Sequence, residues 1–460
     1  METYGSLYVE GKNTEDNRLE FNHDIWNFKN FDDVPVALKQ ADYDALMIGW
    51  PNTYRQKIKE WIPNNGNTGG YCFGMSSLTI LTKMHRLKSS DICAGSSELF
   101  DISKNETSKS VIGYYHISQI SPSIQEGRVN FIGKSVSSQL SDIERMCENV
   151  KTGGAPVLLD LYIGANFTGG HTVVAYSAER GKFTKCGKNY DSRILIYDCN
   201  NKKIKWDEDY CLYYNQGTST WCIPNYPNAS GFMGAFSNVN DIDFKNIVAN
   251  RKSANSYITS RTEQDLTIYN SSGEYFGKVS GATVDTDKIV VYRNTGGVNG
   301  DLTIAIPNEE NKENNYVIVA NNPKDSVDLS IMYDNYYLSA ESNAQESVCF
   351  SENGDIKING KTSDFNIQIT ANEGYYSTDW YQISVSGDSG TDPKLEVTDK
   401  GYILSGKDLS EVTVYAENEK TAGELNLKTD EETVLITQDG ENLCVKSDED
   451  KDGEYETALG

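Results

Sequence analysis

The sequence predicts an α+β domain over residues 1–255, followed by two all-β, sandwich-like modules over residues 264–371 and 372–460. At 460 residues the chain exceeds the usual size of a single hydrophobic core. Helical periodicity is replaced near residue 155 by strand-like runs, which predominate from residue 264 onward. The net charge of −25 divides into −3 over residues 1–250 and −22 over residues 251–460, which places a boundary near the middle.

Helices are expected first. Pro51 suits a first helical turn, and apolar residues recur at helical spacing up to Ile62. A turn-rich break over residues 63–70 separates this helix from a second apolar stripe that runs from Met75 to Leu87. Further on, Ser141-x-x-Glu144 has the form of a capping box, so a helix is expected to begin there; Gly153-Gly154 would end it.

Strands are expected next, at Ala155–Tyr162, His171–Tyr176 and Arg193–Tyr197. Helices followed by an antiparallel sheet form an α+β pattern. Beyond residue 264, short apolar runs alternate with Gly, Asn, Asp and Ser turns, which is typical of β-sandwiches. These runs are LTIYNS, KIVVYR, DLTIAIP, NYVIVAN, VDLSIMY, EVTVYAE and TVLITQD.

Composition restricts the function classes. No apolar run approaches the roughly 20 residues needed to span a bilayer, and the N-terminus carries no signal-peptide pattern. The acidic second half argues against nucleic acid as a partner, because phosphates would be repelled. The nine cysteines include no CxxC pair, and none of the four histidines lies near two cysteines at zinc-ligand spacing. A local disulfide among Cys199, Cys211 and Cys222 is one arrangement that the sequence allows.

Three segments could carry nucleophilic catalysis. Cys72 stands at the start of the second expected helix, where partial positive charge favours a thiolate. His171 follows Gly169-Gly170 at the opening of a strand, and Asp198 ends the strand RILIY at a turn. A cysteine, an imidazole and a carboxylate are the parts of a nucleophile–base–acid triad. Taken singly, each residue could equally be structural: a buried thiol, a hydrogen-bonded core histidine and a turn aspartate.

The segments GYCFGMS, GGHTVVAY and ILIYDCNN, in this order, resemble the nucleophile, histidine and third-residue segments of the papain-like cysteine peptidase superfamily. The resemblance is greatest to its bacterial secreted branch, the bacteriocin-processing-type peptidases, and covers about residues 20–250. It implies a helix lobe and an antiparallel sheet lobe with the site between them. It implies Cys72 as nucleophile, His171 as base and Asp198 as third residue, with Asn200 as the alternative.

This chain departs from the papain pattern at several positions. Gly69 replaces the second cysteine of the papain signature, and the interval from Cys72 to His171 is shorter than the roughly 130–150 residues of papain and cathepsins. Relatives place an oxyanion-binding Gln five or six residues before the cysteine. Here those positions hold Asn67 and Gly66, so Asn67 is the candidate donor, together with the backbone N–H of Cys72.

The second half offers two further candidates. Asp448, Asp450 and Asp452 precede Gly453 as in the first half of a calcium loop, but Leu459 stands where an EF-hand requires Glu. They are a weak calcium candidate, or else part of a solvated acidic tail. An aromatic cluster could bind sugar by stacking or simply fill a sandwich core; it comprises Tyr375, Tyr376, Trp380 and Tyr381.

We therefore expect a cysteine peptidase that hydrolyses peptide or isopeptide bonds through an acyl-enzyme, with no required cofactor. The substrate would be a protein or peptide, and the β modules could bind a cell-surface protein or glycan. An extracellular or cell-surface location is expected. The alternatives are a catalytically inactive binding or adhesion protein, and a transglutaminase or cell-wall amidase that uses the same triad.

Overall fold

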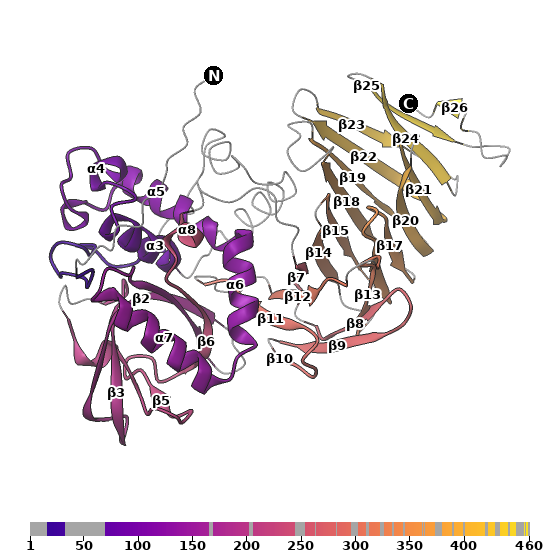
Figure 1. Cartoon of the computed structure of the whole chain (residues 1–460). Helices are drawn as coiled ribbons and strands as arrows, with labels where there is room; N and C mark the ends of the chain where they lie inside the picture. Colours follow the sequence, from indigo (N-terminus) through magenta and orange to yellow (C-terminus); the bar gives the residue numbers. More distant parts are fainter. Residues whose placement is uncertain are drawn as a thin grey trace.

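The computed structural model describes most of the chain. The described residues are 16–32, 70–164, 169–201, 206–243, 254–262, 264–281, 283–295, 302–309, 312–322, 326–333, 335–343, 346–360, 362, 364–372, 380–388, 391–398, 401–418, 422–427, 433–439, 442–447, 455 and 457–458. A helical region comes first, and antiparallel sheets follow it (Figure 1). The helix expected over residues 51–62 lies outside the described residues.

The helical region is built around one buried helix. Helix α3 (Cys72–Lys83) begins at Cys72, as the sequence predicts, and its first ten residues are all buried. Further helices and 3-10 turns follow: α4 (Ser89–Ile92), η1 (Leu99–Asp101), α5 (Glu106–Ile117), η2 (Ser118–Ile120) and α6 (Pro122–Ile132). Helix α5 packs closely on α3, because a Cβ at Gly74 would lie 2.0 Å from the carbonyl oxygen of Ile112. Glycine is therefore required at this crossing of the two helices.

Helix α7 (Val136–Val150) corrects one expectation. It begins at Val136 and not at the Ser141-x-x-Glu144 motif, because Ser135 is its N-cap and accepts a hydrogen bond from Ser138 N. Glu144 lies in mid-helix, where it accepts from the amide of Gln216. Leu140, Ile143, Cys147 and Val150 form part of the buried face of α7.

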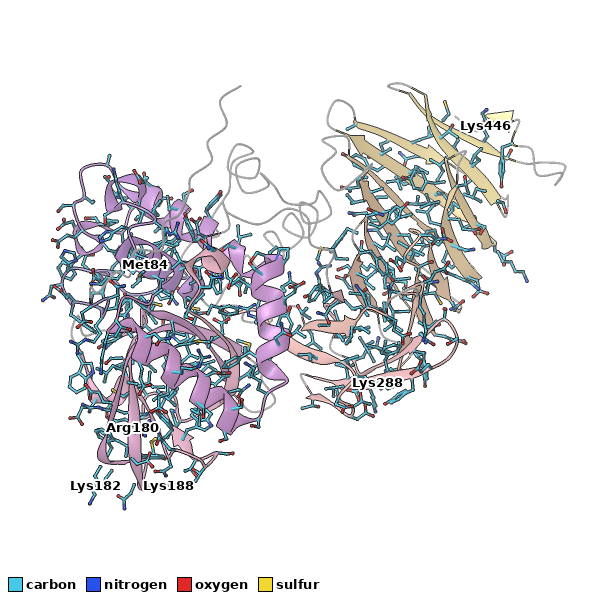
Figure 2. The ribbon with its side chains drawn as sticks, in the orientation of Figure 1. Met84, Arg180, Lys182, Lys188, Lys288 and Lys446 are labelled. Atoms are coloured by element: carbon cyan, nitrogen blue, oxygen red, sulfur yellow. A yellow bond between two sulfur atoms is a disulfide. The ribbon has the colours of Figure 1, made fainter. Side chains whose placement is uncertain are left out.

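A six-stranded antiparallel sheet follows α7 in the described part of the chain. Its order is β5 (Trp221–Cys222), β4 (Cys211–Tyr214), β3 (Lys188–Tyr197), β2 (Gly169–Lys185), β1 (Val157–Ile163) and β6 (Ala229–Phe236). The three strands predicted between residues 155 and 197 are β1, β2 and β3. Alternate residues face opposite sides: Leu158 and Val174 join the core around α3, whereas Leu159 and Val173 join that of α7. In Figure 2 the basic side chains Lys182 and Lys188 lie toward the tip of the β2–β3 hairpin, with Arg180 farther back along β2.

Two large antiparallel sheets form the second half. Among the described residues, one contains β10 (Thr283–Val284), β9 (Tyr275–Ser280), β8 (Leu266–Asn270), β13 (Tyr316–Ala320), β16 (Ser347–Phe350), β17 (Ile356–Asn359), β20 (Thr391–Thr398), β21 (Gly401–Lys407), β24 (Thr433–Asp439), β25 (Asn442–Ser447) and β26 (Thr457–Ala458). The other contains β11 (Val290–Arg293), β12 (Leu302–Pro307), β7 (Asn255–Ser260), β14 (Val327–Met332), β15 (Tyr336–Ser342), β18 (Phe365–Asn372), β19 (Trp380–Asp388), β22 (Ser410–Asn418) and β23 (Ala422–Leu427).

The two sheets share one apolar core, to which Ile258 and Leu338 contribute from one sheet and Ile268 and Ile356 from the other. Each of the seven apolar runs named from the sequence coincides largely with one of these strands. The expected boundary between residues 371 and 372 falls within β18, which pairs with β19 beyond it, and β17 likewise pairs with β20. Both sheets thus continue across that position. We refer to residues 254–458 as the β region.

The β region is packed against the α+β region. Tyr257, Ala305, Met332 and Tyr337 belong to the same buried cluster as helix α3. Tyr162 on β1 donates a hydrogen bond to the carbonyl of Val291 on β11. In Figure 1 the strands β11 and β12 lie beside helix α6, where the two regions meet. Apolar packing and buried hydrogen bonds therefore join the two halves of the chain.

No described helix is long and apolar enough to cross a membrane.

Candidate active site

Cys72 is the first residue of α3, and its side chain is buried. The first N–H groups of an α-helix have no intrahelical acceptor and add partial positive charge at this end. The preceding residue is fixed by Asn30, whose Oδ1 accepts a hydrogen bond from Tyr71 N at 2.7 Å. Trp26 donates from Nε1 to the carbonyl of Met75 at 3.0 Å. Residues before position 32 therefore hold the start of this helix in place.

His171 lies near the start of β2, opposite Leu161 of β1. Its neighbour Thr172 donates its backbone N–H to Cys72 Sγ at 3.5 Å. A second contact joins the same elements, because the Ser76 hydroxyl donates to the carbonyl of Thr172. Strand β2 is thus attached to α3 at the position where the imidazole and the thiol meet.

Asp198 follows the last residue of β3, and its Oδ1 lies 2.9 Å from Nε2 of His171. The same oxygen accepts from the backbone N–H of Asn200 at 2.8 Å, and Tyr226 donates its hydroxyl to Oδ2 at 2.5 Å. The Tyr226 ring packs beside the imidazole, with ring centroids 5.2 Å apart. Both carboxylate oxygens are therefore hydrogen-bonded, and the ring of His171 is held by two neighbours.

Asn200, the alternative third residue, occupies a supporting position. Its Nδ2 lies 3.5 Å from His171 Nε2, farther than the carboxylate of Asp198, and 3.4 Å from the Tyr226 hydroxyl. Its Oδ1 accepts from Asn30 Nδ2 at 2.9 Å. Asn30 therefore connects the loop before Cys72 with the loop after Asp198. In this geometry Asp198, and not Asn200, is the closer partner of the imidazole.

The charges of the site favour an imidazolium. Burial alone would lower the pKa of His171, but the Asp198 carboxylate and Cys72 outweigh it and raise this pKa to about 10. Burial alone would raise the pKa of Asp198, but the charge of His171 and hydrogen bonds from His171, Tyr226 and the Asn200 N–H lower it. Burial and the neighbouring carboxylate raise the pKa of Tyr226, which keeps its hydroxyl a donor. The arrangement can hold a protonated base beside a sulfur nucleophile.

Some of the other sequence candidates are outside the described residues, and the three remaining histidines have other surroundings. Asn67 and the three aspartates Asp448, Asp450 and Asp452 are outside the described residues, as are Tyr375 and Tyr376. His23 contacts Asp24 and Glu98, and His85 follows the C-terminal end of α3. His116 is buried in α5 close to Gln119. Among the described residues, no group of three His, Cys, Asp or Glu side chains could hold a metal ion.

The cysteines differ from the sequence expectation. Cys222 forms a disulfide with Cys186, which sequence spacing did not single out, whereas Cys199 and Cys211 are free thiols. The bond joins the turn of the β2–β3 hairpin to β5 at the edge of the sheet. It lies on the sheet away from Cys72. A pair among Cys199, Cys211 and Cys222, which the sequence allowed, is not formed, because pairing depends on the fold of the hairpin and not on proximity in sequence.

Sequence reasoning missed Tyr226, Asn30 and Thr172. Tyr226 and Asn30 each lie far from the three motif segments in sequence, so no local pattern indicated them. Thr172 was adjacent to His171, and its strand position indicated only that its side chain faces away from that of His171. No family model, curated protein or solved structure matches this chain.

Proposed function

We propose that the α+β region is a papain-like cysteine peptidase domain that hydrolyses peptide or isopeptide bonds. Cys72 is the nucleophile, His171 the base and Asp198 the residue that fixes the imidazole. One observation carries the proposal: Cys72 at a helix start, His171 and the Asp198 carboxylate come from three separate elements and converge in one buried site. Such convergence is the geometric signature of a catalytic triad, independent of sequence order.

The reaction requires no cofactor. The Cys72 thiolate attacks the amide carbonyl carbon, the C–N bond breaks, and the proton on His171 passes to the departing amine. The acyl group is then attached to sulfur as a thioester. Water then attacks this thioester while His171 takes the water proton. The C–S bond breaks, the carboxylic acid product is released, and the thiolate–imidazolium pair is regenerated.

Negative charge on the carbonyl oxygen needs hydrogen-bond donors. The backbone N–H of Cys72 is at the start of α3, where a helix supplies no acceptor of its own. We assign this N–H as one donor and propose Asn67 as the second. The alternative of transfer to an amine uses the same acyl-enzyme, so the incoming nucleophile decides between hydrolysis and transglutaminase-like chemistry.

The Cys186–Cys222 disulfide supports an extracellular or cell-surface location, because such bonds persist in oxidising compartments. We propose that the β region contacts a cell-surface protein or glycan. Its strongly acidic composition favours a partner with basic or neutral surface chemistry.

The test is alkylation of the intact protein by iodoacetamide, a small uncharged reagent chosen because Cys72 and His171 are buried. Rates are compared for the unmodified protein, Cys72→Ala and His171→Ala from about pH 4 to pH 9, with the modified cysteine identified by peptide mass analysis. Rapid reaction at Cys72 below about pH 7, slowed in His171→Ala, is expected. Reaction of Cys72 only above about pH 8 would exclude the thiolate–imidazolium pair and with it the proposal.

A peptide library scored for cleavage, with and without a primary amine, then separates hydrolysis from transfer. Asp198→Ala is expected to lower kcat by on the order of 10²-fold or more. Asn67→Ala tests the second oxyanion donor, whose loss is expected to cost about 10²–10³-fold in kcat.

A further inference from the structure

A segment of the β region lies directly behind the candidate site. Thr295 follows β11, is fully buried, and has its hydroxyl oxygen 2.8 Å from that of Thr172. Thr172 is the residue whose backbone N–H reaches Cys72 Sγ. A Cβ at Gly170 would lie 3.1 Å from the Cα of Thr295, so the glycine before His171 permits this approach. The β region thus contacts both neighbours of His171 in sequence.

Gln119 holds Thr295 at two backbone positions. Its Oε1 accepts from Thr295 N at 2.8 Å, and its Nε2 donates to the Thr295 carbonyl at 3.1 Å. The amide therefore pairs with Thr295 as a neighbouring strand would. Because Oε1 also accepts from Arg128 Nη2 at 3.3 Å, the orientation of the amide is fixed by donors on one side and acceptors on the other.

These contacts close into a ring. Arg128 forms a fully buried ion pair with Asp160, with Nη2 and Oδ2 2.7 Å apart. The Thr172 hydroxyl donates to Asp160 Oδ1 at 2.7 Å, since a carboxylate can only accept. The Thr172 and Thr295 hydroxyl oxygens lie 2.8 Å apart, and the Thr295 hydroxyl is also within hydrogen-bond distance of Gln119 Oε1, at 3.2 Å. The ring runs Arg128, Asp160, Thr172, Thr295, Gln119 and back to Arg128, and Asn294 adds a further acceptor for Arg128 at 2.8 Å.

We propose that Thr295 and Gln119 are positioning residues, through which the β region holds the His171–Thr172 segment of β2 in place beneath Cys72. The effect of these residues on catalysis rests on the proposed function. Their role in holding β2 in place rests only on the hydrogen bonds of the ring. A buried hydroxyl chain that ends on a carboxylate permits little freedom, because any break leaves a desolvated polar group unpaired. The β region is then part of the active site as well as a recognition element.

The test compares Thr295→Val, which removes the hydroxyl at constant shape, with Thr295→Ser, which retains it. Thr370→Val is the matched control, because Thr370 is buried in β18 and its hydroxyl has no partner among the described residues. Two readouts are taken on the full chain: hydrogen exchange of peptides spanning residues 169–174, and iodoacetamide alkylation of Cys72 at about pH 6 and about pH 9. Unfolding midpoints confirm that each variant is folded.

Exchange over 169–174 is expected to accelerate roughly fivefold or more in Thr295→Val and to stay unchanged in Thr295→Ser and Thr370→Val. Alkylation of Thr295→Val is expected to slow about tenfold near pH 6 but less near pH 9, where an unassisted thiol also ionises. Equal exchange in Thr295→Val and Thr370→Val would overturn the inference. Slow alkylation of the unmodified protein near pH 6 would instead overturn the proposed function, and exchange alone would then decide the role of Thr295.

Discussion

Tyr226 donates its hydroxyl to the Asp198 oxygen that does not face His171, while its ring packs on the imidazole. One side chain therefore contacts both members of the His–Asp pair. Desolvation by itself would disfavour the carboxylate, and the phenol is one of the groups that offset this cost. The hydroxyl of Tyr226 makes the hydrogen bond and its ring makes the packing contact, so the two roles can be tested independently.

Replacing Tyr226 with Phe is expected to keep the ring contact and lose the hydrogen bond. Hydrogen bonds to charged groups contribute about 1.5–3 kcal/mol, so the free energy of unfolding should fall by about that amount. The pKa of Asp198 should rise, because the carboxylate loses a donor. Denaturant unfolding near neutral pH measures the first effect. Tyr226→Ala, which also removes the ring, should lose more; equal stability of Tyr226→Phe and the unmodified protein would show that the hydroxyl contact is not formed in solution.

The His171–Asp198 pair should stabilise the fold within a defined pH window. The pKa of His171 is raised from 6.5 to about 10, so its contribution is complete below pH 6.5 and is lost as pH rises through about 10. The pKa of Asp198 is lowered from 3.8, so its contribution is complete above pH 3.8 and is lost as pH falls. The stability difference between the unmodified protein and His171→Ala should be greatest between these two limits.

This window is checked by measuring the unfolding free energies of the unmodified protein and His171→Ala at about pH 5.5 and about pH 9.5. The difference between the two proteins is expected to be larger at about pH 5.5. His23 also titrates with a raised pKa, through its hydrogen bond to Asp24, but it is present in both proteins and cancels. A difference that grows toward the alkaline side would mean that His171 is neutral in the folded protein.

The sequence was sufficient for the parts of the site that depend on local pattern. Cys72 begins a helix because a glycine-rich break precedes an apolar stripe, and Asp198 follows a strand because RILIY ends at a turn. These signals are short-range, so periodicity and turn chemistry reveal them. The predicted start of α7 was wrong because two serines in the same stretch could serve as caps, and it is Ser135 that accepts the capping hydrogen bond, from Ser138 N.

Residues that act across the fold could not be predicted in this way. Asn30 is distant in sequence from the loops that it joins, and Thr295 belongs to the turn after β11 in the β region. Each is a common polar residue whose role exists only once the chain has folded. The seven β runs were predictable from alternation and turns, but the strand order that carries both sheets past residue 372 is a long-range property.

Gly74→Ala should destabilise the helical region. The added Cβ would meet the Ile112 carbonyl oxygen at 2.0 Å and His116 N at 2.8 Å, both backbone atoms that cannot move without shifting α5. Overpacking of this kind costs typically about 1–3 kcal/mol, which thermal or denaturant unfolding detects. Gly133→Ala is the control, because its nearest neighbour would be Val129 O at 3.7 Å and its φ is −65°. Similar stability of the two variants would mean that α5 lies farther from α3 than the structure shows.

The Cys186–Cys222 disulfide should stabilise the sheet edge without being needed for the site. The bond joins residues 36 apart in sequence, and loops of this size typically gain about 2–4 kcal/mol from closure. Mild reduction should therefore lower the unfolding free energy by about that amount, while the rate of Cys72 alkylation changes little, measured after the reductant is removed. The double variant Cys186→Ser/Cys222→Ser should begin at the lower stability and not respond to the reductant, whereas Cys349→Ser should respond like the unmodified protein. Loss of Cys72 reactivity on reduction would contradict this separation, because it would mean that the edge of the sheet and the start of β2 are mechanically coupled.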